Sequence, residues 1–203
     1  MIIGVVDYNA GNLRSVETAL KYLDAEYIIS PDPEKLLKTD RIIFPGVGEA
    51  KAAMEAVRER GLDEGLRSFA ASGKYLLGIC IGCQIFLESS EERNTECLGL
   101  VLGRVKRFPG NMQLKVPHMG WNEVSPRQNH PLFHNIPSGT SFYFVHSYYP
   151  EVTEKANELA VTEYGVVFSS GIVQDNIMAV QFHPEKSGEY GIRMLRNFLK
   201  MKD

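Results

Sequence analysis

Hydrophobic residues in the first half of the chain form short continuous runs, and each run is followed by a longer segment with helical spacing. The runs are rich in β-branched residues and end at Gly, Asp or Pro: IIGVVDY at 2–8, RIIFPG at 41–46 and YLLGIC at 75–80. Continuous apolar runs of this length are typical of strands buried on both faces of a parallel sheet. The pattern therefore predicts repeated strand–helix units.

The second half has a different pattern, in which strand-like runs follow one another with turn signals between them. The runs are GLVLGRVKRF at 99–108, SFYFVHSYY at 141–149, ELAVTEY at 158–164, VVFSSGIVQ at 166–174 and NIMAVQF at 176–182. Few helical stretches intervene, so these runs are interpreted as antiparallel strands. An amphipathic helix is expected over 188–202, and a surface loop over 125–139. Together the two halves predict a doubly wound α/β sheet with an antiparallel extension.

Length and composition narrow the functional classes. With 203 residues, 44% of them apolar, one domain over 1–203 is expected. A net charge of -3 without a Lys/Arg run argues against nucleic acid as a partner. The sequence has neither an apolar stretch near the roughly 20 residues that span a bilayer nor a signal-peptide pattern at its start, so a soluble, cytoplasmic protein without a membrane partner is expected. Three cysteines do not form a disulfide framework.

Cys80 stands at the point where an apolar run changes to a helix-like pattern. In GICIG, Gly78 and Gly82 flank Cys80 at the spacing of a nucleophile elbow, in which a strand turns sharply into a helix. The thiol then lies at a helix N-terminus, where the exposed N–H groups favour the thiolate. A small apolar cysteine packed at a strand end is the alternative.

A thiolate needs a partner that handles protons, and VQFHPEKS at 180–187 offers one. Pro184 favours an extended conformation at His183, and in an extended chain His183 and Glu185 point to the same side. Glu185 could then fix the imidazole tautomer so that the other ring nitrogen faces Cys80. Taken alone, His-Pro-Glu is more typical of a surface turn. Together with the elbow it predicts a nucleophile, a base and an orienting carboxylate.

Acyl transfer at Cys80 also needs hydrogen-bond donors for the developing oxyanion. The backbone N–H of Ile81 is one candidate. The segment FPGVG provides another, because Gly46 and Gly48 would allow the peptides around Val47 to turn an N–H inward at the end of a strand. A glycine-rich turn without a ligand is the alternative for this segment.

In this order and spacing, the segments GICIGCQ, FPGVG and QFHPEKS resemble the class I, or triad, glutamine amidotransferases. The resemblance covers nearly the whole chain. DYNAGNLRS near the start and VPHMGWNEV in the middle are similar, more narrowly, to the glutaminase subunits of imidazole glycerol phosphate synthases in histidine biosynthesis. The resemblance implies a flavodoxin-like doubly wound sheet and a Cys-His-Glu triad at Cys80, His183 and Glu185. It implies no metal and no cofactor.

The same resemblance implies which groups bind the substrate, glutamine, and which partner consumes the ammonia. The implied glutamine site consists of Gln84, Glu92 and the backbone around His146, Ser147 and Tyr148. Gln84 follows Cys80 by four residues and therefore shares its helix face. Glu92 could bind an α-ammonium group, although its acidic surroundings would otherwise indicate a solvated helix end. Structural, hydrogen-bonded roles are favoured for the side chains of His118 and His146.

The implied partner is a (β/α)8-barrel cyclase, which would form a heterodimer with this chain. Trp and Tyr are favoured anchors in interfaces, and the resemblance places PHMGWN at the docking face. The expected contact residues are Met119, Trp121 and Tyr143, with Asn12 nearby. Core packing is the alternative for each aromatic residue alone.

Other interpretations remain open at this stage. The chain could be the glutaminase of another synthase, such as that of vitamin B6. It could also be a redox-sensing α/β protein without hydrolase activity, although a sensor has no need for an oriented base. The family usually has Leu and Met where this chain has Ile81 and Cys83. We interpret Cys83 as a buried helix residue, with a redox or metal role as the alternative.

Overall fold

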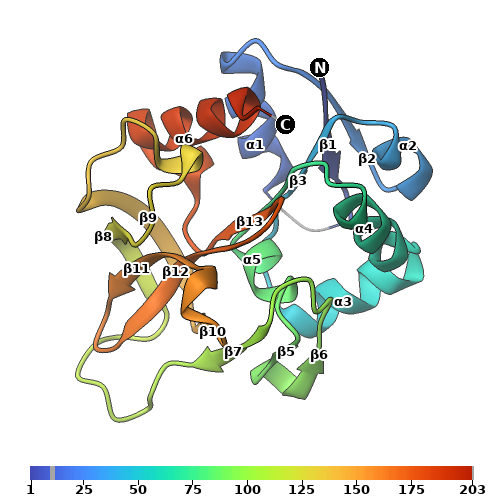
Figure 1. The fold of residues 1–203 in the computed structure, drawn as a ribbon. Helices are drawn as coiled ribbons and strands as arrows, with labels where there is room; N and C mark the ends of the chain where they lie inside the picture. The colour runs from blue at the N-terminus through green and yellow to red at the C-terminus, as the bar shows by residue number, and fades with distance from the viewer. Residues whose placement is uncertain (10–11, 203) are drawn as a thin grey trace.

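The structure is a computed structural model and describes residues 1–9 and 12–202. Ala10 and Gly11 of the DYNAGN motif, and Asp203, lie outside the described residues. A nine-stranded sheet crosses the molecule (Figure 1). In spatial order its strands are β2 (Glu26–Ser30), β1 (Ile2–Val6), β3 (Arg41–Phe44), β4 (Leu76–Ile79), β13 (Ile177–Val180), β12 (Val167–Gln174), β11 (Glu158–Glu163), β8 (His118–Pro126) and β9 (Thr140–His146).

The first five strands of this order pair in parallel, and the remaining pairs are antiparallel. A smaller sheet has the order β10 (Tyr148–Val152), β7 (Gly103–Arg107), β5 (Ser89–Ser90) and β6 (Thr95–Glu96). The predicted doubly wound sheet with an antiparallel extension is confirmed. β13 is the junction, because it pairs in parallel with β4 and antiparallel with β12.

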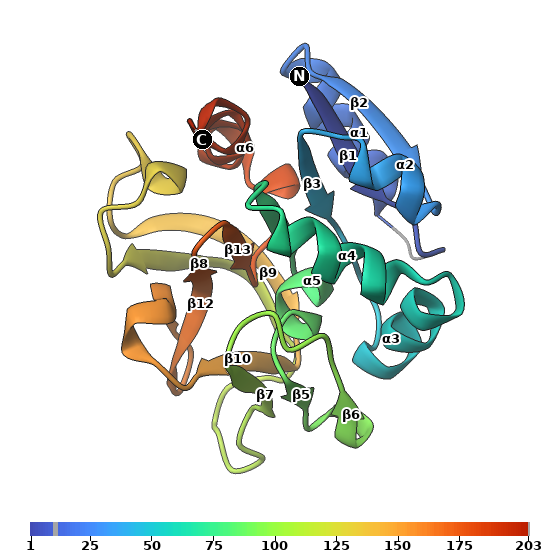
Figure 2. The same ribbon diagram turned by 45° about the vertical axis from the view of Figure 1, so that its right-hand side comes forward.

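Helices cover both faces of the parallel part of the sheet (Figure 2). The helices are α1 (Leu13–Tyr22), α2 (Pro33–Leu37), α3 (Ala50–Glu59), α4 (Leu62–Ala71), α5 (Ile81–Ile85) and α6 (Gly188–Lys200). Successive side chains of a strand point to opposite faces, so Val5 packs in the apolar cluster with α1 and α6, whereas Val6 packs with α2 to α5. The described residues also contain four short 3₁₀ turns: η1 (Glu92–Asn94), η2 (Pro131–Phe133), η3 (Lys155–Asn157) and η4 (Pro184–Lys186).

Several details differ from the sequence-based prediction. Strand β2 was not expected, and the run at 176–182, expected as antiparallel, forms β13, which pairs in parallel with β4. The nine-residue strand β8 overlaps VPHMGWNEV (116–124) and the first two residues of the expected loop, and the hydrophobic pattern did not indicate a strand there. The run at 141–149, expected as one strand, divides at Ser147 into β9 and β10, which belong to different sheets. The expected surface loop at 125–139 contains buried apolar residues: Leu132, Phe133 and Ile136. The helix expected at the C-terminus is confirmed as α6.

Candidate active site

Cys80 lies between β4 and α5 with φ 54° and ψ −102°, a backbone conformation that residues with side chains rarely adopt. Its two flanking glycines leave no room for a side chain. A Cβ on Gly82 would lie 2.3 Å from the carbonyl oxygen of Phe44, and a Cβ on Gly78 would lie 2.8 Å from the backbone of Gly82. The chain therefore has the sharp turn that the glycine spacing predicts.

His183 follows β13 and reaches the same edge of the sheet as Cys80, because β4 and β13 are parallel neighbours. Nδ1 of His183 lies 2.8 Å from Oε1 of Glu185, and both side chains are fully buried. Among the described residues, Nε2 of His183 has no hydrogen-bond partner. Nδ1 is therefore the oriented nitrogen, and Nε2 remains available for a proton exchanged with a reacting group.

Burial lowers the pKa of His183, but the side chains of Cys80 and Glu185 outweigh this effect and raise the pKa to about 10. The imidazole is then favoured in its protonated form at neutral pH. A cation beside the sulfur suits a nucleophilic thiolate.

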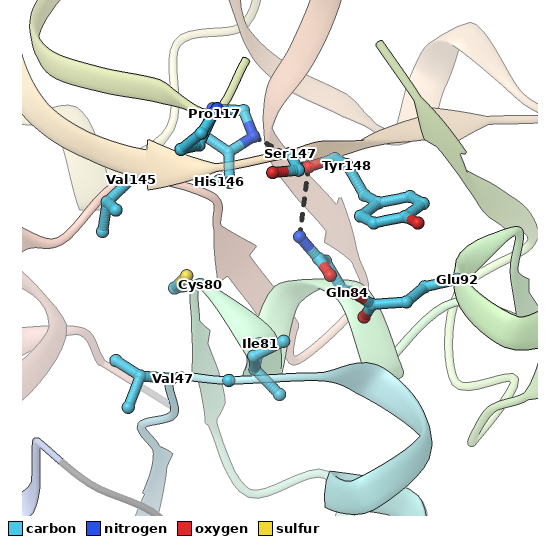
Figure 3. Close-up of a pocket in the computed structure, with 11 residues that line it drawn as sticks. Val47, Cys80, Ile81, Gln84, Glu92, Pro117, Val145, His146, Ser147 and Tyr148 are labelled. Carbon is cyan, nitrogen blue, oxygen red and sulfur yellow. Dashed lines mark hydrogen bonds between the residues drawn. The ribbon is translucent and has the colours of Figure 1, made fainter.

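A cavity of about 270 Å³ lies over Cys80 (Figure 3). In Figure 3 the segment 145–148 faces Cys80 and Gln84 across this space. Most of its lining residues were expected from the sequence: Val47, Gly48, Cys80, Ile81, Gln84, Glu92, His146, Ser147 and Tyr148. Pro117 and Val145 complete the lining. The cavity thus brings together residues from five separate stretches of the sequence.

The segment 46–48 forms a thin wall beside this cavity. Val47 and Gly48 also line a second cavity of about 340 Å³, which Tyr8 shares. Gly48 has φ 106°, and no atom lies within 4 Å of the position of a Cβ there. Gly46 is tightly packed, since a Cβ there would lie 2.1 Å from the hydroxyl oxygen of Tyr8. The packing against Tyr8 therefore fixes this segment at Gly46, whereas the space around Gly48 is open.

Gln84 and Glu92 bring polar atoms to the far side of the cavity. Nε2 of Gln84 donates to the carbonyl oxygen of Tyr148 and to Oε1 of Gln181, each at 3.1 Å. Oε2 of Glu92 accepts the N–H of Ala50 at 2.7 Å. Burial raises the pKa of Glu92, so its carboxylate is partly desolvated and would gain from a cationic group in the cavity.

Sequence reasoning missed two residues that contact this machinery. Nε2 of the fully buried Gln181 points at the sulfur of Cys80, 3.7 Å away. A signal was present, because Gln181 precedes His183 by two residues and an extended chain turns both to one side. The hydroxyl of Tyr8 is buried against Gly46 without a partner among the described residues, and the ring stacks on Phe44 with 4.8 Å between centroids. No pattern in the sequence indicated this contact.

The residues expected at the partner interface do not share one environment. The side chains of Met119 and Trp121 are 63% and 58% exposed on β8. Tyr143 is half-buried and pairs with Trp121 across β8 and β9, their rings 6.3 Å apart. Asn12 precedes α1, and its amide donates to Oε1 of Glu185. The first two are free to contact a partner, whereas Asn12 contacts the candidate triad.

Cys83 is fully buried in the apolar cluster with α3 and α4, and burial raises the pKa of its thiol well above the usual range. This environment agrees with its interpretation as a buried helix residue. Within residues 1–9 and 12–202, no group of three or more His, Cys, Asp or Glu side chains could hold a metal ion. No helix of the described chain is long and apolar enough to span a membrane.

The sequence profile of the family glutamine amidotransferase class-I matches residues 4–201. The chain belongs to this family. This amidotransferase is 49% identical to the protein named imidazole glycerol phosphate synthase subunit HisH of Methanosarcina acetivorans, over 98% of each chain. It is 44% identical to the protein of the same name from Dehalococcoides mccartyi strain CBDB1, over 98% of this chain and 97% of the other.

Solved structures support the same fold for this amidotransferase. A crystal structure titled glutamine amidotransferase has a TM-score of 0.77 at 22% identity, over 98% of both chains. The structure of PurLQS from Thermotoga maritima has a TM-score of 0.76 at 20% identity, over 98% of this chain and 97% of the other.

Proposed function

We propose that this amidotransferase is the glutaminase subunit of an imidazole glycerol phosphate synthase. It hydrolyses glutamine to glutamate and ammonia, and a cyclase subunit uses the ammonia to make imidazole glycerol phosphate and AICAR in histidine biosynthesis. The observation that carries the proposal is the buried His183–Glu185 pair beside the strained Cys80 elbow. The names of the relatives that are 44–49% identical favour this synthase over one that makes vitamin B6.

The reaction begins when the sulfur of Cys80 attacks the side-chain carbonyl carbon of glutamine. The carbonyl oxygen becomes an oxyanion, which accepts hydrogen bonds from the N–H of Ile81 and from an N–H of the segment 46–48. His183 gives a proton to the nitrogen of the collapsing intermediate, the C–N bond breaks, and ammonia leaves. Water then attacks the thioester, His183 accepts one of its protons, and the C–S bond breaks to release glutamate.

The groups opposite Cys80 are proposed to hold the rest of glutamine. The desolvated carboxylate of Glu92 suits the α-ammonium group, and the backbone of Ser147 and Tyr148 offers hydrogen-bonding groups to the amino-acid end. The amide of Gln84 donates a hydrogen bond to the carbonyl oxygen of Tyr148 and so fixes its position. The cavity of about 270 Å³ limits the substrate to a small molecule.

Ammonia released into water at neutral pH becomes mostly ammonium, which is not nucleophilic. Direct transfer to a second active site avoids this loss. We propose that a (β/α)8-barrel cyclase docks on β8 and β9 through Met119, Trp121 and Tyr143. The exposure of Met119 and Trp121 supports a docking role, since large apolar side chains on one strand mark contact surfaces.

Glutamate release by the purified chain tests the function when it is measured alone, with a cyclase subunit, and with the cyclase and its nucleotide substrate. We expect very slow glutamate release by the chain alone and an increase of orders of magnitude with both additions. The reason is that the open space at Gly48 allows the segment 46–48 to stand, in the chain alone, with its N–H turned away from the position of the oxyanion. A full rate from the chain alone, or activation by the partner subunit of a vitamin B6 synthase instead, would contradict the proposal.

A further inference from the structure

A continuous chain of hydrogen bonds joins strand β8 to the sulfur of Cys80. From β8 to the carbonyl oxygen of Tyr148, the atom pairs are Asn122 Nδ2 and His118 Nε2 at 3.2 Å, His118 Nδ1 and His146 Nε2 at 2.9 Å, and His146 Nδ1 and the Tyr148 oxygen at 2.7 Å. From that oxygen to the sulfur, they are the Tyr148 oxygen and Gln84 Nε2 at 3.1 Å, Gln84 Nε2 and Gln181 Oε1 at 3.1 Å, and Gln181 Nε2 and Cys80 Sγ at 3.7 Å. Figure 3 shows the two bonds that meet at the Tyr148 carbonyl. We call this chain the relay.

The proton positions on the two histidines of the relay follow from the carbonyl of Tyr148. The Tyr148 carbonyl can only accept, so Nδ1 of His146 donates to it. A neutral imidazole has one donor and one acceptor nitrogen, so Nε2 of His146 accepts, and Nδ1 of His118 donates to it. Nε2 of His118 must then accept in turn.

Asn122 supplies the donor that His118 requires. Its Oδ1 accepts the N–H of Glu123 at 2.8 Å, and its Nδ2 donates to the carbonyl of Glu163 at 3.0 Å. These two contacts fix the amide orientation, with the second hydrogen of Nδ2 toward His118. A single arrangement of protons therefore satisfies every group from Asn122 to Tyr148.

Both histidines are held rigidly and without charge. The His118 ring lies between the rings of Phe144 and Tyr164, with centroids 4.7 and 3.9 Å away and interplanar angles of 24° and 22°. Burial lowers the pKa of His118 to about 4, and burial is also the main reason that the pKa of His146 falls to about 3. The two rings thus stay neutral at physiological pH, and the proton order of the relay persists.

The relay and the exposed apolar side chains occupy opposite faces of one strand. Met119 and Trp121 point outward from β8, whereas the side chains of His118 and Asn122 point inward. His118 is paired with His146 in the register of β8 and β9. A small shift of β8 when a partner docks would therefore move His118 and, through short bonds, the Tyr148 carbonyl that holds Gln84.

We propose that His118 and His146 are positioning residues. When a partner docks on β8, they pass the resulting displacement along the relay to the carbonyl of Tyr148, and Gln84 and Gln181 pass it on to the sulfur of Cys80. The inference rests on the proposed function, since it takes β8 as the docking strand. Neither histidine exchanges protons with glutamine. Their part is to fix where the glutamine pocket and the nucleophile stand relative to each other.

The test compares His118→Phe, His118→Gln and His134→Phe in the complex with a cyclase. Phenylalanine keeps the stacking but lacks both ring nitrogens, and glutamine restores one donor and one acceptor. His134 is exposed and lies outside the relay. Glutamate release with the cyclase substrate bound, cyclase affinity by calorimetry, and ammonia-dependent synthase activity are measured for each variant.

We expect His118→Phe to retain cyclase affinity and ammonia-dependent activity but to lose about ten- to a hundredfold in activated kcat, the scale of small misplacements at a reacting centre. His118→Gln should recover most of this loss, and His134→Phe should match the wild type. Full activation of His118→Phe would overturn the relay while leaving the glutaminase function intact. Failure of the wild-type chain to bind or respond to the cyclase would instead overturn the function itself.

A measurement on the wild-type protein covers the case in which His118→Phe does not fold. Nitrogen-15 NMR of the imidazoles at neutral pH distinguishes a protonated ring nitrogen from a bare one. The relay requires both His118 and His146 to carry the proton on Nδ1 alone. A proton on Nε2 of either ring, or a positive charge on either ring, would overturn it.

Discussion

The amide of Asn12 donates a hydrogen bond to Oε1 of Glu185, the same oxygen that accepts from Nδ1 of His183. The carboxylate of the candidate triad is therefore held from two sides, by its own histidine and by the residue that precedes α1. Asn12 was expected at the partner interface on the basis of family resemblance. From this contact we infer that Asn12 orients Glu185.

The role of Asn12 can be tested with Asn12→Gly, because glycine tolerates the φ of 81° at this position whereas alanine would add strain. We expect kcat for glutamate release in the activated complex to fall roughly tenfold, as the orientation of the carboxylate is relaxed. Glu185→Gln should cost more, and the double variant should be no worse than Glu185→Gln alone, since both act on one contact. Losses that multiply would show that Asn12 acts independently of Glu185.

Cys80→Ala should eliminate glutamine hydrolysis, because His183 lies beside this sulfur, whereas burial raises the thiol pKa of both Cys83 and Cys97. The assembled synthase should still use added ammonium salts, since the proposed function assigns that chemistry to the cyclase. Cys83→Ser is the matched control and should keep most of the activity. The elbow is misassigned if the Cys80 variant still releases glutamate, or if the Cys83 variant folds normally and is inactive.

Gly46→Ala should reduce glutamate release strongly while leaving the fold intact, because the new Cβ would meet the Tyr8 hydroxyl and push the oxyanion wall out of place. Adding Tyr8→Phe should restore part of the activity by removing that hydroxyl. Gly110→Ala is the control, since no atom lies within 4 Å of a Cβ there. Equal activities of Gly46→Ala and Gly110→Ala would mean that the wall tolerates displacement.

Trp121→Ala should weaken binding of the cyclase by about 2 kcal/mol, the scale of an aromatic hot spot, without changing the unfolding midpoint. Tyr22→Ala offers a comparison, because Tyr22 is a 72% exposed aromatic residue at the other end of α1 from Asn12. Calorimetric titration with the cyclase measures both variants. An unchanged affinity for Trp121→Ala, or an equal loss for Tyr22→Ala, would argue against docking on β8.

The lowered pKa of His118 predicts a loss of stability in acid. Its folded-state pKa of about 4 lies below the unfolded value of about 6.5, so the unfolded chain binds a proton first as the pH falls through this window. The stabilisation is complete above pH about 6.5 and decreases by at most about 1.4 kcal/mol per pH unit down to about pH 4. The polar and titratable groups against this ring are His146, Tyr164 and Asn122, and the rest of its contacts among the described residues are the rings of Phe108, Phe144 and Phe168.

Urea unfolding at pH 7, 6 and 5 tests this prediction with His118→Gln, which cannot titrate. The variant should lose less free energy of unfolding than the wild type over this range, whatever its stability at pH 7. His183 does not produce this effect, because its pKa is raised and its stabilisation persists below the unfolded pKa. Parallel pH profiles for the two proteins would contradict the neutral state of His118.

The sequence predicted the parallel strands β1, β3 and β4 and the elbow, because these depend on local signals, whereas β2 was not expected and β13 was expected as antiparallel. β1, β3 and β4 are continuous apolar runs, and the glycines around Cys80 have the spacing that a tight turn requires. The contact between His183 and Glu185 was also expected, though from an extended chain. In the structure Glu185 lies in the turn η4, which brings its carboxylate back to the imidazole.

Strand β8 could not be predicted in the same way, because its pattern is inverted. Its large apolar side chains, Met119 and Trp121, face outward, and His118 and Asn122 face inward. A pattern search assigns the apolar face to the core and finds no strand here. For Gln181 the sequence indicated only a side shared with His183, because the sulfur of Cys80 is distant in the sequence and the pairing of β4 with β13 brings the two together.

That pairing also determines when the enzyme can first exist during synthesis. β13 inserts between β4 and β12, so the sheet stays incomplete at its centre until residue 180 has left the ribosome. A nascent chain that ends earlier carries Cys80 without His183, Glu185 or Gln181. With the proposed triad, catalytic competence therefore cannot arise before Glu185 has been synthesised, and products truncated before that point hold a cysteine but no hydrolase.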